Sequence, residues 1–106
     1  EVDFQRRVNP GLVHCQRVGN IMGATAALSL ASTIDNGDFD APQRIGVFSY
    51  GSGCCSEFFS GTVRKEGQER LRAMKIGERL DRRHQLSMEQ YDALLEKSRS
   101  MKFGTR

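Results

Sequence analysis

The sequence predicts an α/β fold in which a buried helix is followed by a strand hairpin and then by surface helices. Residues 21–37 are rich in small and apolar residues, and residues 44–50 form a short apolar run. Residues 66–101 are charged, with apolar residues at helical spacing. This order of elements is typical of α/β or α+β proteins. We expect a single domain, because 106 residues suffice for about one.

The first twenty residues give few structural signals. The opening residues form a polar lead, and Asn9-Pro10-Gly11 favours a turn before a short apolar segment from Leu12 to Cys15. Gly19-Asn20 follows. Asn20 stands where the N-cap of the next helix is expected.

Residues 21–37 predict a buried helix, because their bulky residues lie on more than one side and a helix apolar nearly all round is a buried one. The bulky residues are Ile21, Leu28, Leu30 and Ile34. The many small residues between them let a neighbouring backbone come close. Turn residues at 35–42 end the helix.

A hairpin is predicted next. Arg44 to Tyr50 is the clearest strand, and its nearly continuous apolar run suits burial on both faces. Gly51-Ser52-Gly53 is too flexible to continue the strand without a bulge or turn. Residues 57–63 then form the returning strand.

Surface helices are predicted from Glu66 onward. Ser87 and Gln90 have the spacing of a capping box. The stripe that follows is typical of an amphipathic helix and consists of Met88, Tyr91, Leu94 and Leu95. We therefore divide the chain into residues 1–65, with the buried helix and core hairpin, and residues 66–106, with surface helices of the same domain.

Charge and composition restrict the function classes. Residues 1–63 carry a net charge of −2 and residues 64–106 a net charge of +5, so the second part favours an acidic partner. No apolar run approaches the roughly 20 residues of a membrane span, and no leader segment opens the chain. We expect a cytoplasmic protein without a membrane partner. It is expected to be an incomplete chain, since it starts at Glu1 without a methionine and a buried helix and strand need more cover than about 100 residues supply.

Several chemistries find little support. Three irregularly spaced cysteines exclude a disulfide framework, and Cys15, Cys54 and Cys55 are expected to be free, buried thiols. Adjacent cysteines lack the gap of a zinc site, so we expect no metal at the Cys and His residues. No local histidine identifies Cys54 or Cys55 as a nucleophile. The basic residues around Arg82 lack the aromatic platforms of a nucleic-acid surface, and YGSGCC lacks a phosphate-loop spacing.

Two short segments remain as candidates, Gly19-Asn20 and Tyr50-Gly51-Ser52-Gly53. Each places a small polar group beside glycine at the end of an element, and glycine lets a ligand approach closely. An amide or a hydroxyl there can donate to a thioester carbonyl or orient a water. The alternative is that Asn20 is only a helix cap and Ser52 only a turn residue.

At these residues the chain resembles a known family. RVGNIMGATAALSLASTIDNGDF followed by RIGVFSYGSGCCSEFFSGTV is similar to the C-terminal region of the 3-hydroxy-3-methylglutaryl-CoA synthase family. More narrowly, it resembles the bacterial branch that acts on polyketides bound to acyl carrier protein, the 3-hydroxy-3-methylglutaryl-ACP synthase type. The match runs from about Val8 to Val63 and continues loosely through LDRRHQLSMEQYDALL.

The resemblance implies part of the C-terminal half of a thiolase-like fold, layered α-β-α-β-α. It implies an acyltransferase that adds an acetyl group, held on an enzyme cysteine, to a β-ketoacyl thioester, after which hydrolysis frees the product. The family's catalytic cysteine, glutamate and histidine lie N-terminal to this region, and their motifs are absent here. The implied partners are an acyl carrier protein, the rest of the enzyme and a second copy in a homodimer. No cofactor, metal or nucleic acid is implied; the substrates are acyl thioesters on phosphopantetheine.

Five residues carry over from the family. Asn20 and Ser52 match the residues that line the acyl pocket and are the implied catalytic residues, while Gly19, Gly51 and Gly53 leave room for substrate. Met22 departs from the tyrosine common in members that use CoA, and GATA replaces a threonine-glycine-serine run. We take Met22-Gly23-Ala24 and Cys54-Cys55 as marks of the carrier-protein branch. The alternatives are a primary-metabolism synthase that uses acetoacetyl-CoA, a non-catalytic basic module that binds an acidic partner, and another condensing enzyme such as a ketoacyl synthase.

Overall fold

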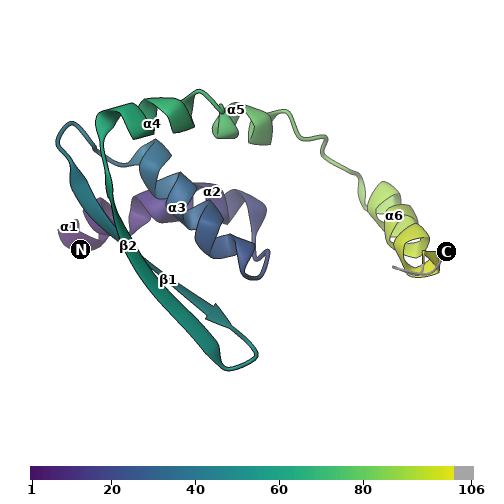
Figure 1. Ribbon diagram of the computed structural model, residues 1–106. Helices are drawn as coiled ribbons and strands as arrows, with labels where there is room; N and C mark the ends of the chain where they lie inside the picture. The colour runs from purple at the N-terminus through teal and green to yellow at the C-terminus, as the bar shows by residue number, and fades with distance from the viewer. Residues whose placement is uncertain (102–106) are drawn as a thin grey trace.

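The computed structural model describes residues 1–101, which form six helices and a two-stranded antiparallel sheet (Figure 1). The last five residues of the predicted 66–106 segment lie outside the described part. The helices are α1 (Val2–Arg7), α2 (Asn9–Val18), α3 (Ala24–Asn36), α4 (Lys65–Arg72), α5 (Ile76–Asp81) and α6 (Met88–Ser100). The strands are β1 (Gln43–Gly51) and β2 (Cys55–Val63). The mixed α/β prediction and the order helix, hairpin, helices are therefore confirmed.

The turn predicted at Asn9-Pro10-Gly11 is wrong, because α2 runs through these residues. Pro10 lies in the first turn of α2, where backbone N–H groups have no partner within the helix, so the missing N–H costs little. Gly11 serves packing instead of a turn. A Cβ on Gly11 would lie 2.8 Å from Oγ1 of Thr33 and 2.9 Å from Oγ of Ser29. Glycine therefore lets α2 and α3 cross closely.

Ser32 joins the two helices at this crossing and is fully buried. Its Oγ accepts a hydrogen bond from the backbone N–H of His14 at 3.1 Å and donates to the carbonyl of Pro10 at 2.6 Å. An α-helix ordinarily joins such groups, four residues apart, directly. One small hydroxyl therefore ties α3 to the backbone of α2, as the run of small residues in 21–37 predicted.

Helix α3 is shorter and less buried than predicted. It begins at Ala24 with Gly23 as its N-cap and no side-chain cap, so the N-cap role of Asn20 is wrong. Its C-terminal end is capped from α4, where Nε2 of the buried Gln68 donates to the carbonyls of Ile34 at 2.7 Å and Gly37 at 2.9 Å. Most other α3 side chains are only half-buried.

The hairpin forms as predicted, with Val47 opposite Phe59 and Phe48 opposite Phe58. The prediction that the strand from Arg44 to Tyr50 is buried on both faces is wrong for this chain. Successive side chains of a strand point to opposite faces. On one face of β1, Ile45, Val47 and Ser49 are half-buried, whereas on the other face Phe48 is 63% and Phe58 69% exposed. Helix α3 contacts β1.

Three helices, α4, α5 and α6, occupy residues 65–100, with a break that the helical spacing did not predict. Lys75 adopts φ +52° and separates α4 from α5. The capping box of α6 is present: Ser87 Oγ accepts from the N–H of Gln90 at 3.2 Å, and the Gln90 side chain accepts from the N–H of Ser87 at 3.0 Å. Helix α6 lies at the end of an extended segment, apart from the other elements (Figure 1).

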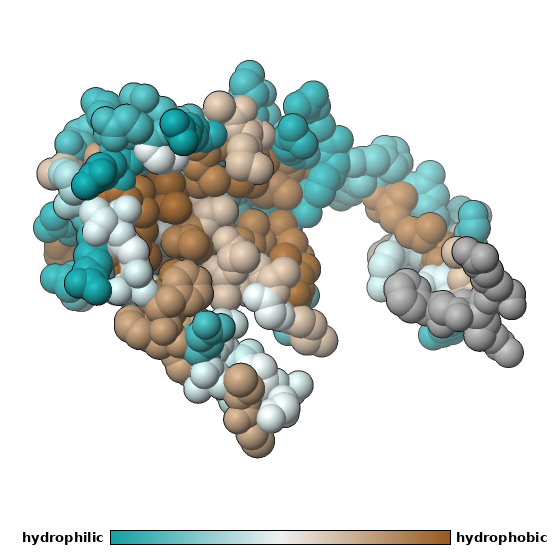
Figure 2. Space-filling model, in the orientation of Figure 1, coloured by the Kyte–Doolittle hydropathy of each residue, from teal (hydrophilic) through white to brown (hydrophobic). Residues whose placement is uncertain are grey.

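The apolar core of the described residues is small. Phe39 is the buried hydrophobic residue, and the other buried side chains are polar: His14, Ser32 and Gln68. In Figure 2 hydrophilic residues cover α4 and α5, and hydrophobic residues gather below them. Among residues 1–101 no helix has both the length and the apolar character needed to cross a bilayer.

Candidate functional site

The loop between α2 and α3, residues 19–23, is built around the side chain of Asn20. Gly19 ends α2 with φ +84°, a conformation that favours glycine. Oδ1 of Asn20 accepts a hydrogen bond from the backbone N–H of Met22 at 2.8 Å. The hydroxyl of Thr25 lies 3.3 Å from the same oxygen and accepts the N–H of Ile21 at 3.0 Å. The loop therefore closes on itself through one amide oxygen.

This arrangement fixes which way the Asn20 amide faces. A backbone N–H can only donate, so the atom that faces Met22 N is the amide oxygen. Nδ2 then points away from the loop, and its two N–H groups have no acceptor among the described residues. A preoriented pair of donors on an exposed loop suits an oxygen that gains negative charge during a reaction.

Ser52 lies at the tip of the β1–β2 hairpin. Gly51 pairs with Cys55, so Ser52, Gly53 and Cys54 form a three-residue loop. Cys54 takes φ +56°, the left-handed residue that commonly closes such loops. Ser52 is exposed, and its hydroxyl makes no hydrogen bond within residues 1–101. The turn prediction is confirmed, and the hydroxyl is free to bind another group.

The glycines beside Ser52 are not required by the backbone of this chain. Neither Gly51 nor Gly53 has a positive φ. A Cβ at Gly53 would meet nothing within 4 Å, and one at Gly51 would meet only the Cys55 carbonyl, at 3.5 Å. Nothing within residues 1–101 therefore demands the absence of a side chain at either position. This leaves open space on both sides of Ser52.

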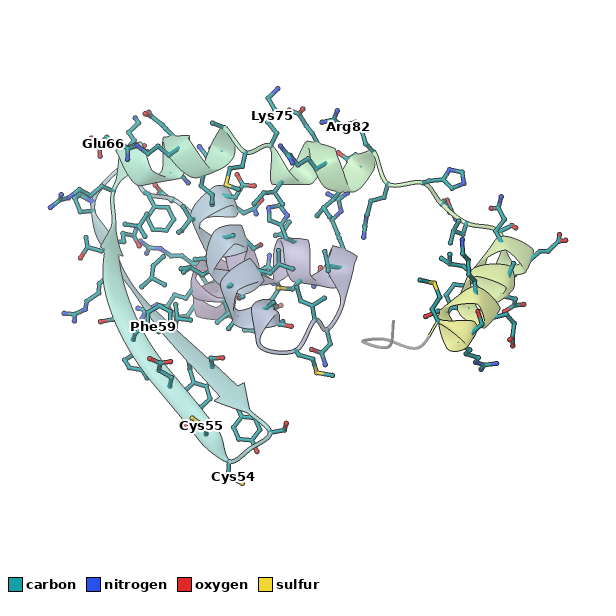
Figure 3. All side chains as sticks on the ribbon, turned by 45° about the vertical axis from the view of Figure 1, so that its right-hand side comes forward. Cys54, Cys55, Phe59, Glu66, Lys75 and Arg82 are labelled. Atoms are coloured by element: carbon teal, nitrogen blue, oxygen red, sulfur yellow. The ribbon has the colours of Figure 1, made fainter. Side chains whose placement is uncertain are left out.

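The structure places the two candidate loops toward the same side of the molecule without joining them. In Figures 1 and 3 α3 begins on the side where the hairpin tip lies. A cleft of about 120 Å³ separates α3 from β1 and is lined by residues that include Ala26, Leu30 and Phe48. No hydrogen bond within the described residues connects Asn20 with Ser52. Their cooperation in one pocket stays a prediction.

The prediction that the cysteines are buried is wrong. Cys54 and Cys55 are exposed at the hairpin tip (Figure 3), and Cys15 is half-buried. All three cysteines are free. A two-stranded hairpin that extends beyond the helices leaves the side chains at its tip in solvent. No cluster of three or more His, Cys, Asp or Glu side chains suited to a metal ion occurs in residues 1–101.

Sequence reasoning did not find the polar cluster of the buried His14, the half-buried Asp35 and the exposed Arg72. His14 is 3% exposed, and its Nε2 lies 2.8 Å from Oδ2 of Asp35. Arg72 donates to the backbone carbonyl of Asp35 from Nε at 3.1 Å and from Nη2 at 3.0 Å. These contacts tie α2, α3 and α4 together. Because the partners are 21 and 37 residues apart, no local pattern could have paired them.

The basic segment, residues 64–83, contains α4 and α5. Residues 64–83 hold eight Lys or Arg against four Asp or Glu. Some charges are paired, as Lys75 is with Glu78 at 3.5 Å. Five arginines make no ion pair within the described residues: Arg64, Arg70, Arg79, Arg82 and Arg83. This surface, the basic ridge, is mostly hydrophilic in Figure 2.

The chain matches one family of enzymes along almost its whole length. The family profile described as "Hydroxymethylglutaryl-coenzyme A synthase C terminal" matches residues 1–104. The chain belongs to this family, and the resemblance seen in its sequence is confirmed.

Known relatives agree with this assignment. The chain is 63% identical, over all 106 residues, to the polyketide biosynthesis 3-hydroxy-3-methylglutaryl-ACP synthase PksG of Bacillus subtilis, of which it covers 25%. It is 35% identical over 89 residues to the hydroxymethylglutaryl-CoA synthase of Enterococcus faecalis; the match covers 83% of this chain and 23% of that one. The chain thus spans about a quarter of the length of these relatives.

Solved structures show the same fold. A structure of PksG matches with a TM-score of 0.95 over 99% of this chain and 26% of its own. The HMG synthase of the curacin biosynthetic pathway, solved in complex with acetyl donor-ACP, matches with a TM-score of 0.93 at 64% identity and with the same coverage. The prediction of part of a thiolase-like HMG synthase fold is confirmed.

Proposed function

We propose that this chain is the C-terminal segment of an acyltransferase that adds an acetyl group to a β-ketoacyl thioester on an acyl carrier protein, as in polyketide β-branching. The observation that carries the proposal is the Asn20 loop, in which the amide oxygen is held at 2.8 Å by Met22 and the two N–H donors face outward. The 63% identity to a 3-hydroxy-3-methylglutaryl-ACP synthase supports the substrate class.

In this proposal the chain supplies the substrate pocket and the rest of the enzyme supplies the cysteine, glutamate and histidine. The Nδ2 donors of Asn20 stabilise negative charge on the acetyl-thioester oxygen as the acetyl group loses a proton and becomes the enolate that attacks the β-ketone. The Ser52 hydroxyl borders the same pocket, and Gly19, Gly51 and Gly53 leave room for the acyl chain. The reaction uses no metal or cofactor, and the enzyme acts in the cytoplasm as a homodimer.

The test is a condensation assay of the complete enzyme with acetoacetyl-carrier protein and acetoacetyl-CoA. We expect a higher kcat/KM with the carrier protein. Asn20→Ala and Ser52→Ala should each lower kcat about 100-fold, typical of losing a preorganised donor. Ser60→Ala is the matched control, since its hydroxyl only accepts from Arg44 at the surface of β2. Unchanged turnover in both pocket variants would remove these residues from the mechanism, and a preference for the CoA thioester would favour the primary-metabolism alternative.

The basic ridge supports a second role, the binding of an acidic partner. Carrier proteins are acidic, so the five arginines without ion pairs suit such a surface. Binding of the carrier protein should weaken as salt screens these charges. Association that is insensitive to salt would contradict this role without affecting the proposed chemistry.

A further inference from the structure

Thr25 contacts the candidate catalytic amide directly, and nothing in its sequence position marked it. Its Oγ1 lies 3.3 Å from Oδ1 of Asn20 and 3.0 Å from the backbone nitrogen of Ile21. Its own backbone N–H donates to the carbonyl of Met22 at 2.9 Å. Thr25 therefore touches three of the loop residues that precede α3.

The direction of these hydrogen bonds follows from the donors available. The N–H of Ile21 can only donate, so the Thr25 oxygen accepts there and its single proton goes to Asn20 Oδ1. That amide oxygen then accepts two hydrogen bonds, one from Met22 N–H and one from Thr25. The plane of the amide is fixed from two directions, and the donors on Nδ2 are further polarised by the bonds to the oxygen.

The position of Thr25 makes it a rigid support. It is the second residue of α3, and a side chain there leans toward the N-terminus of the helix, where the loop lies. A β-branched side chain has few χ1 rotamers. The helix is itself held by α2, where Ser32 and Gly11 form the close crossing. Contacts thus connect the packed pair α2 and α3, through Thr25, to the exposed amide of Asn20.

We propose that Thr25 is a positioning residue that holds the Asn20 amide, with its donors directed at the thioester oxygen. This inference rests on the proposed catalytic role of Asn20. Without the Thr25 hydroxyl, Asn20 keeps the bond from Met22 but gains freedom to rotate about it. The donors then spend less time in the reactive geometry, so the loss should fall on kcat more than on KM.

The test compares variants of the complete enzyme in the condensation assay. Thr25→Val removes the hydroxyl at constant shape and should lower kcat about 10-fold, less than outright removal of a donor. Thr25→Ser keeps the hydroxyl and should restore kcat to within about 3-fold of the parent. Thr62→Val is the matched control, because it makes the same change at an exposed position of β2, where the hydroxyl makes no hydrogen bond within residues 1–101. We expect it to leave kcat unchanged.

A double variant separates positioning from a general loss of structure. In an Asn20→Ala background, Thr25→Val should cause no further loss of kcat, since the group it orients is gone. An equal 10-fold loss in that background, or full activity of Thr25→Val beside an impaired Asn20→Ala, would overturn the inference. Full activity of Asn20→Ala would instead overturn the catalytic role proposed for Asn20. If Thr25→Val does not fold, Thr25→Ala removes the same hydroxyl without adding a methyl group and takes its place.

Discussion

Gly11 lies where the two central helices cross closely. Its missing side chain lets the hydroxyls of Ser29 and Thr33 reach the α2 backbone, since a Cβ would lie under 3.0 Å from both oxygens. The close approach of α3 to the α2 backbone at this point also brings Ser32 within hydrogen-bond distance of Pro10 and His14. A glycine inside a helix ordinarily costs stability relative to alanine, and here close packing offsets that cost.

The same substitution should therefore have opposite effects at two helical glycines. Gly11→Ala overpacks the crossing and should lower the stability of the complete enzyme by about 1–3 kcal/mol. Gly67→Ala, in α4 with nothing within 4 Å of its added Cβ, should be neutral or raise stability by up to about 1 kcal/mol. Thermal unfolding of both variants is the measurement. A rise in Tm for Gly11→Ala would show that the crossing is looser than the contacts indicate.

The candidate site residues could be predicted from the sequence, because each is a small polar residue next to glycine. The hydrogen-bond partners of their side chains could not be predicted in this way. Asn20 and Ser52 stand beside glycines in short segments that end an element, which is visible without a structure. Thr25 lies in a run of small residues that predicts packing, and its bond to Asn20 depends on the path of the loop. The exposure of Cys54 was missed because burial of a hairpin tip depends on what surrounds it.

At the scale of elements, a side chain of α4 caps the C-terminal end of α3. The last carbonyls of a helix have no partner within it. Gln68 reaches across from α4 and donates to the carbonyls of Ile34 and Gly37, and it is itself buried. A side chain 31 residues away thus provides the C-terminal cap that a glycine or a local side chain often provides.

A substitution at Gln68 that keeps the side-chain volume but removes the amide should measure what the two capping hydrogen bonds contribute to stability. Gln68→Met keeps the size but leaves two carbonyls without their donor, so stability should fall by about 1–3 kcal/mol. Gln16→Met is the matched control, since Gln16 is exposed on α2 and makes no side-chain hydrogen bond within residues 1–101. The two midpoints of thermal unfolding are compared. Equal midpoints would mean that water replaces Gln68 as the donor to these carbonyls.

Element types were predictable wherever a periodic pattern was strong. The capping box placed the start of α6, and the apolar run from Arg44 to Tyr50 placed β1. Boundaries failed where one residue has two compatible roles. Proline suits both a turn and the first turn of a helix, which hid the start of α2 at Asn9. Lys75 in a left-handed conformation breaks a charged helical run that shows no glycine at that point.

At the scale of the whole molecule, apolar surface is left uncovered on two elements. The face of the hairpin that bears Phe48 and Phe58 is largely exposed, and Tyr91 and Leu94 of α6 are 50% and 56% exposed. Against this, Phe39 is the buried hydrophobic residue of the described part. The 106 residues span about a quarter of the length of their relatives. In the complete enzyme we expect these faces to pack against the remaining chain, as the predicted buried strand requires.

The isolated 106 residues should consequently be inactive and poorly soluble, because exposed patches of this kind promote association. Size-exclusion chromatography should show aggregates, and a dye that binds apolar surface should fluoresce. The double variant Phe48→Ser/Phe58→Ser should have opposite effects on the isolated chain and on the complete enzyme. It should make the isolated chain more soluble, but it should destabilise the complete enzyme by several kcal/mol, as loss of two buried aromatic rings does. A monomeric, soluble parent chain, or a complete enzyme that tolerates both serines, would mean that this hairpin face lies in solvent and not in the core.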